Sequence, residues 1–159
     1  MGDEFSLSER EYVSANRLAT KPTRKHILIY GMSFLLLVLC AVFDPNIIVQ
    51  SAAIGGLVGG ATVHVIARFL YAPWQTKKQY RSYLAIQEKQ VVSLNEDGVS
   101  FVSSIGEGNL PWKNIIKWRE NDDHILLYQA QEIYHIVPKH VSISTELALR
   151  LSKKVGKSS

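Results

Sequence analysis

Two pairs of glycines are the residues whose spacing first suggests a chemical role. Gly55 and Gly56 are followed by Gly59 and Gly60 in the stretch SAAIGGLVGGATVHV. Glycine-rich loops bind phosphates, but a dinucleotide fingerprint needs G-x-G-x-x-G between a strand and a helix, and a P-loop ends in Gly-Lys-Ser/Thr. The chain has neither order at this point. These glycines therefore do not predict a nucleotide site.

The same spacing has a different meaning in a membrane helix. Gly55 and Gly59 form one GxxxG motif, Gly56 and Gly60 form another, and His64 follows one helical turn later. Such motifs let a neighbouring helix approach closely. We therefore predict that these five residues form a helix-packing or partner interface. Two alternatives stay open: packing within the chain, and association with a second copy or another membrane protein.

Three histidines could suggest metal or hydrolase chemistry. His124, His135 and His140 lie in or beside predicted strands, but they have no cysteine partner and no i, i+4 pairing. No nucleophile-elbow motif accompanies them. The sequence thus predicts no metal, no cofactor and no catalytic residue. Trp112 and Trp118 are expected to pack in a core rather than to hold a ligand.

The glycines lie within the second of two charge-free apolar runs, residues 27–43 and 47–67. As helices these runs would be roughly 26 and 32 Å long, against a hydrocarbon core of about 30 Å. Asp44–Asn46 contains a proline, which ends the first helix and turns the chain. We predict a transmembrane helical hairpin over residues 26–72. A buried hairpin of a soluble protein is the alternative.

The charges beside the two runs predict an orientation. Lysine and arginine flank both runs on their outer ends, whereas the hairpin tip has neither residue. The positive-inside rule then places both termini in the cytoplasm, with Arg68 near the cytoplasmic headgroups. The net charge of +4 is modest. It favours anionic membrane lipid over nucleic acid as a partner.

Residues 1–25 are predicted to be a cytoplasmic segment with one short helix. Ser8 and Glu11 have the spacing of a capping box, so a helix should run from about Glu9 to Leu18. Its few apolar residues predict docking on the membrane surface or on the C-terminal domain. Residues 73–89 are expected to form a helical connector that Pro73 kinks or breaks.

Residues 90–159 are predicted to form an antiparallel sheet domain closed by one helix. The stretches QVVSL and VSFVSS flank a turn in which Gly98 should supply a positive φ. IGEGNLPW is interpreted as a further turn. Trp112, Ile115 and Ile116 should share one face, and HILLYQA with IYHIV forms a second hairpin. The closing helix should have Ser144 as its N-cap and Gly156 at its C-terminus.

The order of these parts resembles the YcxB-like family of small bacterial membrane proteins. The resemblance rests on FSLSEREYV, the two-span hairpin, LNEDGVSF, GEGNLPWKNIIKWRENDDHILLY and IYHIVPK. It implies a pleckstrin-homology-like domain on the cytoplasmic side and no enzymatic activity. The glycine-rich second span departs from the family's general pattern.

The fold class predicted is therefore an α+β membrane protein, with a transmembrane hairpin and a pleckstrin-homology-like domain. We expect a non-enzymatic inner-membrane protein whose domain and glycine-rich helix mediate protein or lipid interaction. The alternative is an immunity protein that binds a membrane-acting antibacterial toxin.

Overall fold

The computed structural model describes residues 2–156 and 158. They form two compact units. The sheet unit is built from Met1–Thr20 and Thr76–Ser159, and the hairpin unit from Lys21–Gln75.

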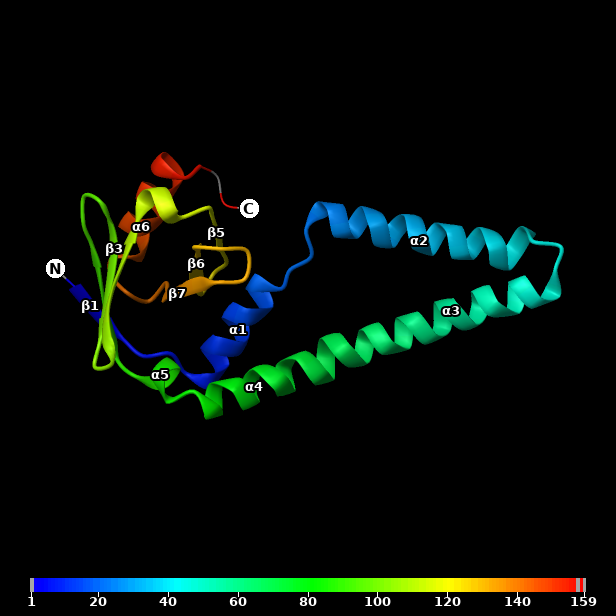
Figure 1. Ribbon diagram of the computed structural model, residues 1–159, viewed down its shortest axis with the longest axis horizontal. Helices are drawn as coiled ribbons and strands as arrows, with labels where there is room; N and C mark the ends of the chain where they lie inside the picture. Colours follow the sequence, from blue (N-terminus) through cyan, green and yellow to red (C-terminus); the bar gives the residue numbers. More distant parts are fainter. Residues whose placement is uncertain (1, 157, 159) are drawn as a thin grey trace. The chain divides into compact units, whose positions relative to one another are not determined.

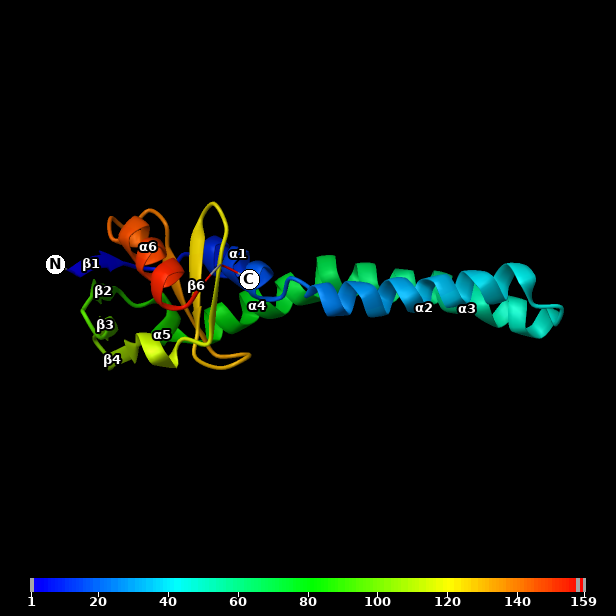
Figure 2. The same cartoon turned by 90° about the horizontal axis from the view of Figure 1, so that it is seen from above.

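The hairpin unit consists of two antiparallel helices, α2 (Arg24–Phe43) and α3 (Ile47–Ile66), which lie side by side in Figures 1 and 2. The side chain of Asn46 accepts a hydrogen bond from the Ile48 N–H at 2.9 Å and so caps α3. The predicted turn at Asp44–Asn46 is thereby confirmed. By length and composition, both helices could cross a membrane.

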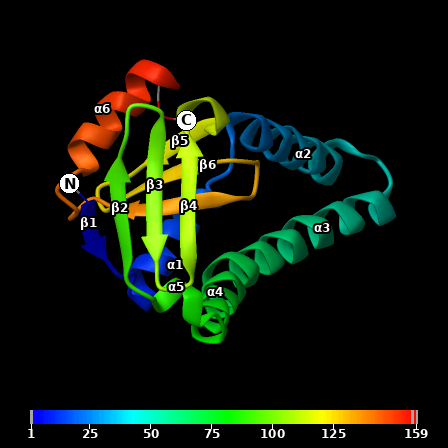
Figure 3. The same cartoon turned by 60° about the vertical axis from the view of Figure 1, so that its left-hand side comes forward.

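The sheet unit contains two antiparallel sheets. Their strand orders are β1-β2-β3-β4 and β5-β6-β7, and Figure 3 shows β2, β3 and β4 running next to one another. The strands are β1 (Gly2–Phe5), β2 (Gln90–Leu94), β3 (Gly98–Ser103), β4 (Gly106–Pro111), β5 (Lys117–Glu120), β6 (His124–Tyr128) and β7 (Tyr134–Pro138). The remaining helical elements are α1 (Glu9–Ala19), η1 (Ala67–Tyr71, a π-helix), α4 (Ala72–Ser82), α5 (Leu84–Gln87), η2 (Trp112–Asn114, 3₁₀) and α6 (Ser144–Lys154).

Strand β6 is buried on both faces, and this organises the core. Ile125 and Leu127 face the main cluster, to which both sheets and α6 contribute. Leu126 and Tyr128 point the other way, because side chains alternate along a strand, and pack against α1. The prediction that the N-terminal helix docks on the membrane or on the C-terminal domain is thereby resolved: α1 packs on the three-stranded sheet.

The helix ends agree with the sequence at two points and differ at one. Ser8 and Glu11 form the predicted capping box, since the Ser8 N–H donates to the Glu11 carboxylate at 2.9 Å and the Glu11 N–H donates to Ser8 Oγ at 3.3 Å. Gly156 has a φ of 105° after α6. Ser144, however, is the first residue of α6 rather than its N-cap. The N-cap is Ile143, whose N–H donates to the Asp3 carboxylate at 3.0 Å.

The expected role of Gly98 is wrong. Among the described residues only Gly156 has a positive φ. A Cβ at Gly98 would lie 2.7 Å from Pro111 Cα and still closer to the Leu110 carbonyl oxygen. Glycine is required here because the backbone of β4 passes close to that of β3.

Two further expectations for this region are corrected. The stretch predicted as a turn is largely strand β4, which pairs with β3 over its whole length. Trp112 and Ile115 are buried, as predicted, but Ile116 is 56% exposed and does not share their face. Ile115 follows the 3₁₀ helix η2 and is extended, so the side chains of Ile115 and Ile116 point in opposite directions.

Candidate functional site

The glycines of α3 divide into two rows. At about 100° per residue, Gly55 and Gly59 lie roughly 160° and 120° around the helix from Ala53, the one buried residue of α3. A Cβ at Gly55 or Gly59 would have nothing within 4 Å. This row is therefore directed away from α2 and carries no side chain of its own.

The second row lies nearer to α2. A Cβ at Gly56 would meet Leu37 Cδ2 at 3.9 Å, whereas one at Gly60 would again meet nothing within 4 Å. His64 continues this row and is exposed, and Arg68 is half-buried in η1. Of the four glycines, only Gly56 would therefore bring an added Cβ within 4 Å of a side chain of α2.

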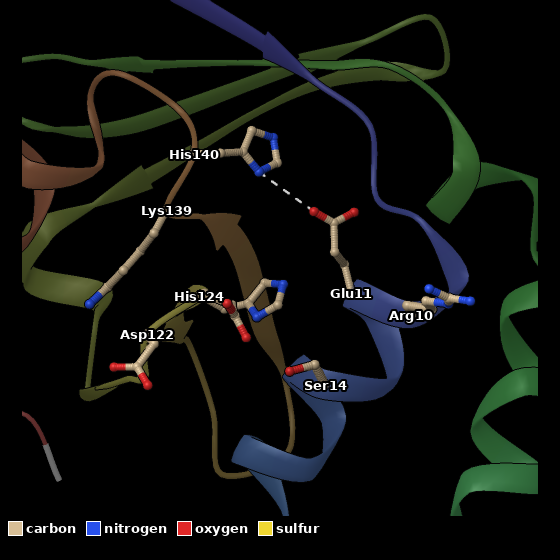
Figure 4. Close-up of a pocket in the computed structure, with 8 residues that line it drawn as sticks. Arg10, Glu11, Ser14, Asp122, His124, Lys139 and His140 are labelled. Carbon is tan, nitrogen blue, oxygen red and sulfur yellow. Dashed lines mark ion pairs between the residues drawn. The ribbon is translucent and has the colours of Figure 1, made fainter.

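A polar cleft of about 540 Å³ lies in the sheet unit, against α1. Figure 4 shows side chains from α1 facing those from the turn before β6 and from the segment after β7. The lining residues are Arg10, Glu11, Ser14, Asp122, Asp123, His124, Lys139 and His140. The sequence predicts no metal-binding or hydrolase role for His124 and His140. It does not predict this cleft either, because the lining residues come from three distant segments.

Glu11 links the capping of α1 to the charges of the cleft. Its carboxylate accepts hydrogen bonds from Ser8 and lies 3.5 Å from His140 Nδ1. Burial acts to raise the pKa of Glu11, but the bonds from Ser8 and the nearby His140 and His124 outweigh it, so the pKa is lowered. The carboxylate is therefore held in its charged form.

His124 is the unusual group of the cleft. It is 1% exposed, and neither of its ring nitrogens has a hydrogen-bond partner among the described residues. Burial lowers its pKa, and the charges of Asp123 and Glu11 offset this only in part. The ring is therefore neutral at pH 7.

A comparison with known families matches one segment of the sheet unit. Residues 94–154, from the end of β2 to the end of α6, match the family model for YcxB-like protein. This segment is a YcxB-like domain. The resemblance seen in the sequence is thus confirmed for this part of the chain. No curated protein and no solved structure matches the chain.

The YcxB-like domain does not form the sheet unit alone. Strand β1, helix α1 and all of β2 except Leu94 lie outside the matched residues. Even so, β1 and β2 complete the four-stranded sheet, and α1 covers one face of β6. One wall of the cleft, which α1 supplies, is therefore an addition to the matched segment.

The domain does not bring its three histidines together. His135 lies away from the cleft and stacks on Phe101, with ring centroids 4.7 Å apart. Within residues 2–156 and 158, no three histidine, cysteine or acidic side chains are placed to hold a metal.

Both tryptophans of the YcxB-like domain pack in the core, as predicted. Trp112 and Trp118 are 7% and 4% exposed. Their indole N–H groups donate to the carbonyl oxygens of Glu96 at 3.0 Å and Gly156 at 2.8 Å. Trp118 thereby ties the end of α6 to β5.

His124 should make the stability of the sheet unit sensitive to mild acid. Its pKa is lower in the folded protein than its ordinary value near 6.5, so unfolding takes up a proton as the pH falls below about 6.5. The free energy of unfolding should decrease between pH 7 and pH 5. His124→Leu should reduce this decrease, as measured by urea titrations of the full chain in detergent micelles.

His135→Leu is a second variant for the same measurement, because burial also lowers the pKa of His135. The two variants should each remove part of the pH dependence, and the double variant should remove more than either. An unchanged pH dependence in His124→Leu would mean that this ring does not resist protonation in the folded state.

Proposed function

We propose that the chain is a non-enzymatic integral protein of the bacterial inner membrane. Its hairpin unit would span the bilayer with both termini in the cytoplasm, and the glycine row Gly55–Gly59 would receive a membrane helix of a partner. The sheet unit would bind protein or lipid on the cytoplasmic side. The observation that carries this proposal is the open space at Gly55 and Gly59 on the side of α3 away from α2.

The surface of the hairpin unit supports membrane insertion. None of the side chains of α2 is buried, and Ala53 is the one buried residue of α3. Large apolar side chains such as Leu36, Phe43 and Val58 are more than half exposed. Contiguous apolar surface of this kind is rare in soluble monomers and common where lipid covers it.

The strand arrangement of the sheet unit supports the pleckstrin-homology-like expectation. Four antiparallel strands and three antiparallel strands enclose one core, and α6 contributes Leu147 and Leu151 to it. We therefore propose that the sheet unit, which includes the YcxB-like domain, has this fold. Its cleft pairs Glu11 with His140, and Lys139 with Glu120 at 2.8 Å, which suits a structural or binding role better than catalysis.

The glycine row suits association because close backbone approach adds van der Waals contact where lipid provides no hydrophobic driving force. The double substitution Gly55→Leu with Gly59→Leu should therefore lower the signal of a two-hybrid association assay in the bacterial inner membrane by about fivefold or more. The first measurement would pair the chain with itself, and a positive signal would identify a second copy as the partner.

Ile54→Leu with Val58→Leu is the matched control. These residues have the same four-residue spacing on another exposed face of α3. The control should leave the signal close to that of the unaltered chain. If both double variants associate equally, the glycine row is not the interface.

A further inference from the structure

The outer edge of β4 offers unpaired backbone groups. β4 is the last strand of its sheet, and its residues Gly106, Glu107, Gly108 and Asn109 are exposed. The Trp112 N–H donates to the Asp97 carbonyl at 2.9 Å. Because hydrogen-bonded pairs alternate along an antiparallel ladder, Leu110, Gly108 and Gly106 bond to β3.

It follows that Glu107 and Asn109 direct their N–H and C=O groups away from the sheet. No backbone partner for these groups occurs in the described part of the chain. An exposed strand edge with free donors and acceptors is a template for a further strand. Natural sheets usually protect such edges, whereas the edge strand β4 contains two glycines.

The face beside this edge is also open. Leu110 is buried, so the alternation of side chains puts Gly108 and Gly106 on the core-facing side of β4. A Cβ at either glycine would meet nothing within 4 Å. The two glycines therefore leave a gap where a strand would normally place side chains against the core.

This gap is part of a groove of about 350 Å³. Phe101 of β3 and His135 of β7 stack on each other in its wall, and Ala85 adds further apolar surface. Gly106 and Gly108 line the groove, and they alternate along β4 with the residues whose backbone groups point outward. An added strand would therefore find hydrogen-bonding groups and a place for a side chain at one site.

We propose that the β4 edge binds an extended segment of another protein by strand addition, with one apolar side chain of that segment in the groove. The residue opposite Gly108 would point inward, and its neighbours would lie on the outer face with Glu107. Because Glu107 is exposed and acidic, lysine or arginine suits these neighbouring positions.

A second copy of this chain suits the site less well. If β4 paired with β4 of another copy, Gly106 and Gly108 of that copy would face the groove and leave it empty. The inference deepens the proposed function, since it assigns the binding of protein by the sheet unit to one strand edge. It does not depend on the glycine row of α3.

The test uses the full chain in detergent micelles and a capped, fluorescent nine-residue peptide with alternating lysine and valine. Fluorescence anisotropy should show saturable binding. Asn109→Pro removes an outward N–H without removing a bond to β3, and proline is tolerated on strand edges. It should weaken binding by at least about tenfold, whereas Asn109→Ala should change it less than about threefold.

A second variant tests the groove independently. Gly108→Leu puts a side chain into the open space and should also weaken binding by about tenfold or more, with intact folding checked by near-ultraviolet circular dichroism. A peptide of the same composition with its valines clustered should not bind. Equal binding by Asn109→Pro and Asn109→Ala, or none by the unaltered chain, would overturn the proposal.

Two outcomes separate this inference from other possibilities. A dimer of the chain that Asn109→Pro dissociates would identify a second copy as the occupant and overturn the proposal of a foreign segment. Gly55→Leu with Gly59→Leu should leave peptide binding unchanged. If the chain shows no association in the membrane two-hybrid assay but binds the peptide, the proposed function of the glycine row fails and this inference stands. If it associates in the membrane but does not bind the peptide, this inference fails alone.

Discussion

Replacement of Gly98 by alanine should lower the free energy of unfolding of the sheet unit by about 3 kcal/mol or more. The new methyl group would overlap the Leu110 carbonyl oxygen and lie 2.7 Å from Pro111 Cα. Both obstacles are backbone atoms of the paired strand, so no side-chain rotation can relieve the clash. Separation of β3 from β4 would also expose Val99 and Leu110, which are both buried. Urea titration of the full chain in micelles, followed by tryptophan fluorescence, measures the effect.

Gly106→Ala and Gly108→Ala are the matched controls for Gly98→Ala. They lie on the neighbouring strand of the same hairpin, but a Cβ at either site has open space around it. Both controls should stay within about 0.5 kcal/mol of the unaltered chain. A loss of similar size in all three variants would mean that the requirement is for glycine flexibility in general rather than for close backbone approach at position 98.

Replacement of Arg119 by methionine should cost about 2 to 4 kcal/mol. Arg119 lies in β5 and is 8% exposed, and its Nη1 donates to the carbonyl oxygens of Leu18 at 3.2 Å and Ala19 at 3.0 Å. These carbonyls end α1, where four C=O groups have no partner within the helix and the dipole favours a cation. Loss of the guanidinium removes both of these hydrogen bonds and loosens α1 from the sheet.

The control for Arg119→Met is Arg150→Met. Arg150 also donates to a backbone carbonyl, that of Asn95 at 3.1 Å, and pairs with Glu146, but its side chain is 35% exposed. Exposed pairs contribute little, so the control should cost less than about 1 kcal/mol. Hydrogen exchange of the α1 amides should increase in Arg119→Met and not in Arg150→Met. The same stability in both variants would show that Arg119 does not anchor α1.

Local patterns predicted the parts of the chain where neighbouring residues decide the structure. Pro45 and its flanking residues end α2 and start α3, because proline restricts the backbone before it. Ser8 and Glu11 cap α1 as their spacing predicts. The tandem glycines were recognised as candidates for helix packing. Each of these signals lies within a few residues of sequence.

The sequence did not predict β1, β4 or the cleft, because distant residues create them. Gly2–Phe5 contains glycine and two acidic residues, which disfavour strands, yet it forms β1 by pairing with β2. The glycines of Gly106–Pro111 suggested a turn, but pairing with β3 extends the segment. His124 looked like any strand histidine, and only the packing of α1 gives it a buried, unpartnered ring.

The sequence by itself therefore determined the two apolar helices and their tight turn, the capped N-terminal helix, the alternating strands and the family of the C-terminal segment. These follow from composition, from periodicity and from local hydrogen bonds. The tertiary structure alone decided that Asp3 accepts a hydrogen bond from Ile143 at the start of α6, that Gly98 allows two backbones to approach, and that the β4 edge stays open beside a groove. The physical reason is that close approach, burial and an unpaired edge depend on which distant segments contact one another in the folded chain. A local sequence pattern does not specify those contacts.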